Sequence, residues 1–394
     1  MTDIATPFDA LKSYPGLIHR QPVFVNNMVD LDRYHLRFLD WQGNLLADDA
    51  NVPAFLTQLP RILPDMNLRQ KALLTMPQSW CQSLYDMELN GMELTLDIAN
   101  ASPTSTFAPN LAYAGHAESK TSPMRTRMLL IDLNQVDNAV MTDNLASWRQ
   151  QYEQLCALNV NDENQLNQCK IHHIDLVQGN FYTRPAAHPP YKISPDAQTL
   201  MSLLVKLQDT DAEADDLAQI ISQDVTLSYK LLRLINSAFF GLPRQLTSCR
   251  EAVVMLGFNQ IKTWASLLCL SGLDHKPNEL RSLAMTRARM CELLARYYKG
   301  QSDSFFAAGL FSTLDALLDK PMIDVVQDLP LAPELETALL NHDGPIGRAL
   351  LDVLNYEQGR WQAVAQSPLP IECLARAYLD AIYWTRQLNQ IINE

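Results

Sequence analysis

The fold of the C-terminal half is decided by ISQDVTLSYKLLRLINSAFFG, which occupies residues 221–241. Its central part, Leu227 to Asn236, predicts a helix. Asn236 and Ser237 at the end of that helix, and Gly257 further on, are expected to form helix ends and turns rather than to bind a ligand. The stretch therefore indicates a helical region in which short turns separate the helices.

Helical spacing continues on both sides of this stretch. Apolar residues recur at i, i+3, i+4 and i+7 in Leu200, Leu203, Leu204 and Leu207, and again in Leu310, Phe311, Leu314, Leu317 and Leu318. Further helices are expected at Asp215–Ser222, Ile261–Ser271, Leu283–Tyr298, Gly347–Tyr356 and Ile371–Ile392. The chain from Asp196 onward is therefore predicted to be all α.

The N-terminal half has a different rhythm, in which short apolar runs alternate with helical patterns as in an α/β unit. Leu94, Leu96 and Ile98 alternate with polar neighbours, the period of two expected when one face of a strand meets a core. A loop is expected at Ala99–Pro109, which is rich in Ser, Thr and Pro. The expected strands are Val23–Val25, Tyr34–Phe38, Leu94–Ile98, Leu129–Leu133 and Phe181–Tyr182.

A proline-rich segment marks the boundary between the two halves. Four prolines fall within residues 185–195, where they remove backbone donors and fix an extended chain. Ser194 and Pro195 then suit the N-cap and the first position of a helix. The predicted organisation is a first domain at residues 1–187, a linker at 188–195 and a helical domain at 196–394.

Composition excludes several kinds of function. Lys and Arg total 31 against 44 Asp and Glu, a net charge of −13 without a basic block, so nucleic-acid binding through phosphate neutralisation is not expected. The segment from Met1 to Tyr14 lacks a signal-peptide core, and no run approaches the roughly 20 apolar residues that span a bilayer. A cytoplasmic protein without membrane insertion is therefore expected. Its seven cysteines form no C-x-x-C pair, which favours buried free thiols.

The stretch quoted above, residues 221–241, resembles a known protein family. Residues 221–241 and EAVVMLG at residues 251–257 closely resemble the opening of HDOD domains. GLFSTLDALL at residues 309–318, GPIG at 344–347 and YEQG at 356–359 resemble later helices of the same domain as it occurs behind an EAL-type domain. The resemblance covers roughly Pro195 to Glu394.

The N-terminal half resembles an EAL domain more faintly. HRQPVF at residues 19–24 is similar to the first strand of such domains, and QGNFYTRP at residues 178–185 to their closing Gln-Gly motif. EAL domains are barrels related to the TIM type that hydrolyse cyclic di-GMP with divalent metals. Because residues 1–187 fall short of the ~250 typical of such barrels, the resemblance implies a shortened or distorted barrel.

The resemblance also implies that the metal site is degenerate. Metal-assisted phosphodiester hydrolysis needs several carboxylates around Mg²⁺ or Mn²⁺. His35 stands where the signature glutamate is found, and an imidazole suits an oxygen-ligand magnesium site poorly. The next acidic pair is reduced to Asp97 and Asn100, and the usual double aspartate has no equivalent around Leu111 to His116.

The later positions of the site are changed as well. Leu130 replaces the expected lysine, and Asn161 replaces a later glutamate. Asp132 and Gln178 are then the main survivors. The expectation is a barrel without catalytic residues, metal or cofactor.

The HDOD resemblance implies kinship with HD phosphohydrolases, in which an adjacent His and Asp hold metal. Ser312 and Thr313 occupy the matching positions here, so that site is also expected to be lost. A literal pair, His342 and Asp343, lies in an expected turn away from the motif. We interpret it as coincidence, because a motif needs its structural context.

These observations predict a catalytically inactive signalling regulator or scaffold that contacts unknown protein partners, in pathways such as cyclic di-GMP-linked motility or biofilm control. One alternative is a cyclic dinucleotide receptor that holds ligand through residues such as Gln178 without cleaving it. The expected loss of the metal ions argues against binding of a cyclic dinucleotide, because in such sites much of the affinity for the nucleotide comes through bound metal ions. The other alternative is a residual phosphodiesterase that uses Asp97, Asp132 and His35. Monomer and homodimer both remain open.

Overall fold

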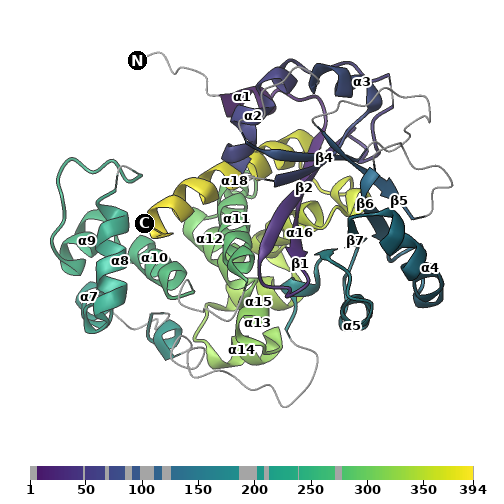
Figure 1. Ribbon diagram of the computed structural model, residues 1–394. Coiled ribbons are helices and arrows are strands. Elements are labelled where there is room, and N and C mark those ends of the chain that lie inside the picture. Colours follow the sequence, from purple (N-terminus) through teal and green to yellow (C-terminus); the bar gives the residue numbers. More distant parts are fainter. Residues whose placement is uncertain are drawn as a thin grey trace. The chain divides into compact units, whose positions relative to one another are not determined.

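The computed structural model describes residues 7–47, 49–66, 71–84, 91–97, 111–117, 126–185, 202–207, 213–237, 239–270 and 277–393 (Figure 1). It divides into two compact units. The first consists of Met1–Tyr182 and Tyr356–Leu379, and the second of Thr183–Asn355 and Asp380–Glu394. A segment near the end of the chain therefore belongs to the unit that contains the N-terminus.

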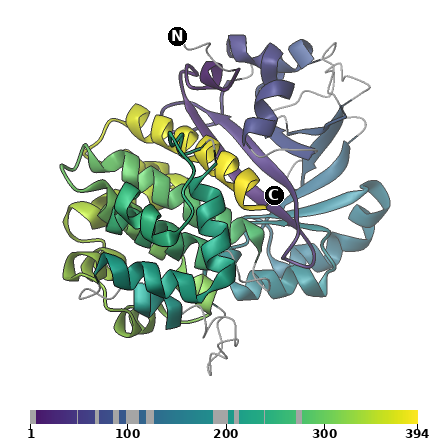
Figure 2. The same cartoon turned by 90° about the vertical axis from the view of Figure 1, so that its left-hand side faces the viewer.

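The first unit is built around a closed barrel of eight strands in sequence order. β1 pairs antiparallel with both β2 and β8, whereas all the other neighbouring pairs are parallel. Figure 2 shows β1 and β2 as two long purple strands side by side. The strands are β1 (Leu17–Val25), β2 (Leu31–Leu39), β3 (Lys71–Thr75), β4 (Glu93–Asp97), β5 (Ala112–His116), β6 (Thr126–Asp132), β7 (Gln154–Leu158) and β8 (Leu176–Gln178). The predicted TIM-like barrel is thus confirmed.

Alternating side chains of the strands enter two separate apolar layers. Leu130 of β6 packs with Val23, Leu73 and other side chains of the barrel interior. Its neighbour Leu129 points to the opposite face and packs with Trp148 in a cluster outside the strands. β6, β7 and β8 therefore each supply side chains to both an inner and an outer core.

Most of the helical segments in the barrel unit before residue 184 are short. α4 (Asn138–Gln151) and α5 (Glu163–Ile171) begin at aspartate caps, where Asp137 accepts from the Val140 amide and Asp162 from the Gln165 amide, each at 2.8 Å. The other described helical segments of Met1–Thr183 have three to five residues: α1 (Pro7–Leu11), η1 (Ala54–Gln58), α2 (Leu59–Ile62), η2 (Leu63–Met66), α3 (Gln78–Cys81), η3 (Gln82–Leu84) and η4 (Phe181–Thr183). This reduced layer fits the expected shortening.

Four of the five expected strands fall on β1, β2, β4 and β6, although Ile98 lies outside the described residues. The strand expected at Phe181–Tyr182 is wrong, because these residues form η4. Their rings pack on Phe24, with centroids 5.5 and 5.0 Å away, and this contact favours a tight turn over an extended chain. The loop at Ala99–Pro109 and the linker at 188–195, with Ser194 and Pro195, lie outside the described residues.

The C-terminal segment of the first unit packs on β1. The Tyr356 hydroxyl donates to the Ile18 carbonyl at 3.3 Å, and the Tyr378 hydroxyl donates to the Arg20 carbonyl at 3.1 Å. Between them, His19 Nε2 lies 2.8 Å from the Glu357 carbonyl oxygen and therefore donates to it. The antiparallel strand β1 is thus held on one edge by a segment more than 300 residues later in sequence.

The second unit is helical, as predicted. Its described helices include α7 (Ala214–Gln223), α8 (Val225–Ile235), α9 (Cys249–Leu256), α10 (Phe258–Leu270), α11 (Asn278–Ala295), α12 (Ser302–Phe311), α13 (Leu314–Leu318), α14 (Met322–Asp328) and α15 (Pro333–Asn341). α16 (Gly344–Glu357) and α18 (Ile371–Asn393) contribute residues to both units, and α17 (Trp361–Val364) belongs to the first. In the part of the chain that the structure describes, no helix combines the length and the apolar character needed to span a bilayer.

Two local features explain how these helices connect. Asn236 ends α8 and exchanges two hydrogen bonds with the Leu246 backbone, at 2.8 and 2.7 Å, which is the helix-end role expected from the sequence. Gly309 of α12 lies so close to α11 that a Cβ atom would overlap the backbone of Arg287. α11 and α12 therefore pack tightly because one residue lacks a side chain.

The apolar pattern from Leu310 to Leu318 does not form one helix. α12 ends at Phe311 and α13 begins at Leu314. Between them, the hydroxyls of Ser312 and Thr313 donate to the carbonyls of residues 309 and 310, at 2.7 and 3.1 Å. Such local side-chain bonds compete with the helical ladder, and the periodicity alone did not reveal this break.

Candidate functional site

The candidate site lies where the parallel strands end. In α/β barrels the carboxyl ends of the strands meet at one face, and binding sites form there. Because β1 runs antiparallel to β2, its first residues lie at this same face, with His19 opposite Arg37 and Gln21 opposite His35. We call this face the mouth of the barrel.

Four side chains form a continuous hydrogen-bonded chain across the mouth. His35 Nε2 lies 2.6 Å from the Thr75 hydroxyl, which donates to Asp97 Oδ2 at 2.7 Å. Asp97 Oδ1 lies 2.7 Å from His116 Nε2. His35, Thr75 and Asp97 are buried, whereas His116 is partly exposed. The chain therefore joins β2, β3, β4 and β5.

This pattern fixes the protonation of His35. The Thr75 proton goes to Asp97, so His35 must donate through Nε2. Its buried Nδ1 has no hydrogen-bond partner among the residues that the structure describes. Burial, followed by the nearby positive charge of Arg37, holds the pKa of His35 well below its usual value. His35 is therefore a neutral imidazole.

Asp97 is the anionic end of the chain. Burial alone would raise the pKa of Asp97, but the hydrogen bond and charge of His116, together with the hydrogen bond from the Thr75 hydroxyl, lower it. Asp97 thus stays ionised, and its contact with His116 becomes an ion pair when that imidazole is protonated.

A guanidinium group lies beside this chain. Arg37 Nη2 donates to Gln21 Oε1 at 2.6 Å, and Gln178 Nε2 donates to the same oxygen. Burial lowers the pKa of Arg37, while the charges of Asp97 and Asp132 raise it. Because arginine stays protonated in proteins, the mouth contains a permanent cation.

Asp132 ends β6 and is engaged by three donors. Its Oδ1 accepts from Asn159 Nδ2 at 2.8 Å and from the Asn134 amide at 2.9 Å, and its Oδ2 accepts from Gln135 Nε2 at 3.4 Å. The backbone N–H of Asn159 in turn donates to Gln178 Oε1 at 3.3 Å. Asp132 and Gln178 are thereby linked through Asn159.

Of the remaining candidate residues, those that the structure describes supply no side chain that could bind a metal at the mouth. Leu130 is fully buried in the apolar interior of the barrel. Asn161 bonds to the Asn159 carbonyl at 3.0 Å and accepts from the Asn180 amide at 3.3 Å, which shapes the loop after β7. Asn100 lies outside the described residues.

This donor set does not fit a cluster of divalent ions. Among the described residues, no three His, Cys, Asp or Glu side chains converge in a way that could hold a metal. Of the two carboxylates described above, Asp97 accepts bonds on both oxygens, and so does Asp132. A magnesium site needs several free oxygens, and the nearby guanidinium would repel the ion.

The structure also reveals partners that the sequence does not single out as candidates. Thr75, His116, Gln21, Arg37 and Asn159 all join the candidate residues at the mouth. Arg37 and His35 lie two residues apart on β2, so strand alternation places both side chains on the inner face. That alternation was the available signal, whereas the pairing with Gln21 depends on register.

The positions that correspond to an HD motif have a structural role. Ser312 accepts two bonds from Arg287 Nη1, at its carbonyl and at its hydroxyl, both at 3.2 Å. Thr313 is buried and bonds to the Leu310 carbonyl. His342 and Asp343 lie at the turn between α15 and α16, where His342 has a positive φ of 56°. The literal pair therefore lies on a different connection from the junction of α12 and α13.

Comparison with known proteins assigns a family to part of the helical half of the chain. Residues 193–323 match the family model described as the HDOD domain. The chain is 31% identical over 244 residues to the cyclic di-GMP phosphodiesterase CdgJ of Vibrio cholerae, covering 60% of this chain and 56% of that protein. It is also 31% identical over 220 residues to the uncharacterized protein YuxH of Bacillus subtilis, covering 54% of each. The chain thus spans about half the length of these curated relatives.

Solved structures align more loosely. A putative phosphohydrolase from Shewanella amazonensis aligns with 51% of this chain and 94% of its own, at a TM-score of 0.38 and 14% identity. A putative signal transduction protein from Marinobacter aquaeolei aligns with 95% of this chain and 86% of its own, at a TM-score of 0.31 and 13% identity. The family match and the strand topology together identify a chain that carries an HDOD domain at residues 193–323 and a closed eight-stranded barrel before it.

Proposed function

We propose that this protein is a non-catalytic signalling regulator of the cytoplasm that acts by binding other proteins. The observation that carries the proposal is the chemistry of the barrel mouth. The oxygens of Asp97 and Asp132 already accept hydrogen bonds from the protein, and Arg37 supplies a fixed positive charge beside them. The HDOD domain and the relative named as a cyclic di-GMP phosphodiesterase support a signalling role.

Hydrolysis of a phosphodiester would require this network to be taken apart. A metal ion on Asp97 would have to displace the Thr75 and His116 donors and overcome repulsion by Arg37. The free Nδ1 of the neutral His35 is buried, and burial holds the pKa of this imidazole well below its usual value, so it is a weak base for activating water. These costs support binding rather than turnover as the function of the barrel.

The test is a product assay on the purified full chain. Cyclic di-GMP is incubated with the protein and Mg²⁺, Mn²⁺ or EDTA, and the expected result is no linear product above the rate without protein. Metal-dependent turnover that Asp97→Asn and Asp132→Asn each abolish would refute the proposal and restore the residual phosphodiesterase.

A second candidate is a cyclic dinucleotide receptor that needs no metal. It is favoured by the Arg37 guanidinium, which could pair with a phosphate in place of a cation, flanked by the amides of Gln21 and Gln178. Calorimetric titration of cyclic di-GMP in EDTA distinguishes the two candidates. The receptor predicts binding that weakens at least about tenfold in Arg37→Gln, whereas the regulator predicts no binding in either protein.

A further inference from the structure

The helical unit contains a hollow that the barrel chemistry does not explain. It has a volume of about 270 Å³ and is lined by an aromatic cluster together with polar side chains from α10, α11 and α12. The aromatic cluster consists of Phe239, Phe240, Trp264, Phe306 and Trp384. Its neighbouring ring centroids lie 5.3 to 6.0 Å apart.

The cluster already holds one guanidinium. The Arg289 guanidinium carbon lies 5.6 Å from the Trp384 ring centroid, and its Nη1 bonds to Glu292 Oε2 at 2.7 Å. Aromatic faces attract cations at this range, and a nearby carboxylate adds to the attraction. The protein's own arginine therefore shows what chemistry these rings accommodate.

A second carboxylate faces the same hollow without a partner. Asp303, in the first turn of α12, makes no hydrogen bond or ion pair with any described residue. Its charge favours the N-terminal end of that helix, which alone would not define a site. Here, however, it lies beside aromatic rings and a cavity, and the charge of Glu292 is already balanced by Arg289. The hollow therefore has one uncompensated negative charge.

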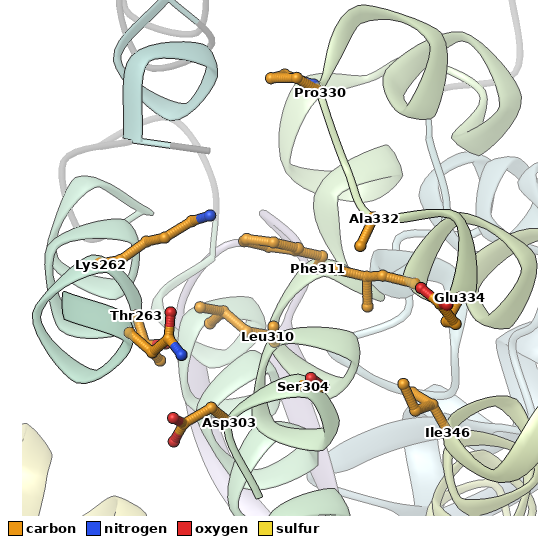
Figure 3. A pocket seen from close by; sticks show the side chains of 13 residues that line it. Lys262, Thr263, Asp303, Ser304, Leu310, Phe311, Pro330, Ala332, Glu334 and Ile346 are labelled. Carbon is orange, nitrogen blue, oxygen red and sulfur yellow. The ribbon is translucent and has the colours of Figure 1, made fainter. Parts of the chain in front are cut away.

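An apolar pocket continues from this hollow. Thr263 and Asp303 line both, and the second pocket has a volume of about 220 Å³. Figure 3 shows Asp303 and Thr263 at one side of this pocket, with Leu310 and Phe311 further inside and Ile346 across from them. A second unpaired carboxylate, Glu334, and one lysine, Lys262, also line it. The two spaces together offer a cation position next to an apolar position.

We propose that this paired site binds a segment of a partner protein in which an arginine or lysine stands next to an apolar residue. The cationic group enters the aromatic cluster and pairs with Asp303, and the apolar side chain enters the pocket lined by Leu310 and Phe311. The net charge of −13 attracts such a segment over longer range. The proposal names a partner chemistry for the binding role proposed above and rests on that proposed function.

The test uses the full chain and two peptides that differ in one charge. The first is acetyl-Gly-Leu-Arg-Leu-Gly-amide, and the second has citrulline in place of arginine, which keeps the shape and removes the charge. Binding is followed by calorimetry and by fluorescence of the tryptophans in the cluster. We expect the arginine peptide to bind at least about tenfold more tightly than the citrulline peptide.

Two matched variants assign the effect to the site. Asp303→Asn is expected to lower the affinity for the arginine peptide to that of the citrulline peptide. Asp324→Asn, in the first turn of α14, makes the same change in net charge away from both pockets and is expected to bind as the unmodified chain does.

Equal affinity for the two peptides would overturn the proposal in favour of a purely apolar occupant. Unchanged binding by Asp303→Asn, or no binding of either peptide at millimolar concentration, would also overturn it. Turnover of cyclic di-GMP is measured separately, so failure of this site and failure of the proposed function give different results.

Discussion

At the residue scale, Thr75 is the link on which the barrel mouth depends. Its hydroxyl accepts from His35 and donates to Asp97, and all three side chains are buried. A buried polar chain of this kind is stable only while every member has a partner, because each group left alone keeps the full cost of its desolvation.

Replacement of Thr75 by Val should therefore destabilise the barrel unit by about 2–4 kcal/mol, since the shape is kept while a donor and an acceptor lose their partner. Urea unfolding followed by circular dichroism measures the change. Thr142→Val on the exposed face of α4 is the control, with an expected change within about 0.5 kcal/mol. Equal effects of the two substitutions would show that the chain across the mouth adds no stability.

His19 makes the stability of the barrel depend on pH. Burial, followed by the charge of Arg37, lowers the pKa of His19 to about 3, against about 6.5 in the unfolded chain. Below pH 6.5 the unfolded state takes up a proton that the folded state refuses, so stability falls as pH falls, until about pH 3. At about 1.4 kcal/mol per unit, the loss from this residue between pH 6.5 and 5 is about 2 kcal/mol.

The His19→Gln variant separates this contribution from other titrations. Its amide can still donate to the Glu357 carbonyl but does not titrate. The difference in unfolding free energy between pH 7 and pH 5 should shrink by about 2 kcal/mol relative to the unmodified chain. The exposed His173→Asn is the control, and an identical pH dependence in all three proteins would contradict the assignment.

At the element scale, the contact between the C-terminal segment and the first two strands can be tested with a pair of glycines. Gly43, in the turn after β2, and Gly91 have nearly the same positive φ, 81° and 82°. A Cβ atom at Gly43 would overlap the Trp361 indole, whereas no atom of the described residues lies within 4 Å of one at Gly91. The two sites thus share backbone strain and differ in packing.

Gly91→Ala should cost about 1–2 kcal/mol of stability from the positive φ alone. Gly43→Ala should cost more, because Trp361 must also move away from its edge-on contacts with His19 and Tyr356, now at 5.3 Å each. A double-mutant cycle with Trp361→Ala measures the coupling by thermal unfolding. Additive effects would mean that this segment does not brace the strands.

The same scale explains what the sequence could and could not predict. The helices of the HDOD domain, such as α7 and α8, were predictable because a period near 3.6 persists over ten or more residues. β3, β5, β7 and β8 have three to five residues that do not alternate between apolar and polar side chains, whereas the equally short β4 does alternate and was predictable. His35, Asp97, Asp132 and Gln178 were predictable as candidates by resemblance. Thr75 and His116 pair with these candidates only because of the cross-strand register, and a single sequence does not reveal that register.

At the scale of the whole molecule, the units do not follow the order of the chain. The first domain predicted from the sequence ends at residue 187, whereas Tyr356–Leu379 belongs to the barrel unit. Tyr356, Val364, Leu374 and Tyr378 are all buried. Burying a large apolar side chain contributes about 1.5–3 kcal/mol, so a few such residues match the usual stability of a domain.

A fragment of residues 1–187 should therefore fail to unfold cooperatively. The rescue variant joins residue 187 to residues 356–379 through a Gly/Ser linker of about 20 residues, whose r.m.s. length is roughly 25 Å. Urea titrations of both, followed by tryptophan fluorescence, should give a sigmoidal transition only for the rescue variant. A cooperative transition of the short fragment at the same midpoint would mean that the barrel is complete without the C-terminal segment. Failure of both would point instead to a need for the HDOD helices, because the linked variant retains every segment of the barrel unit and lacks only residues 188–355 and 380–394.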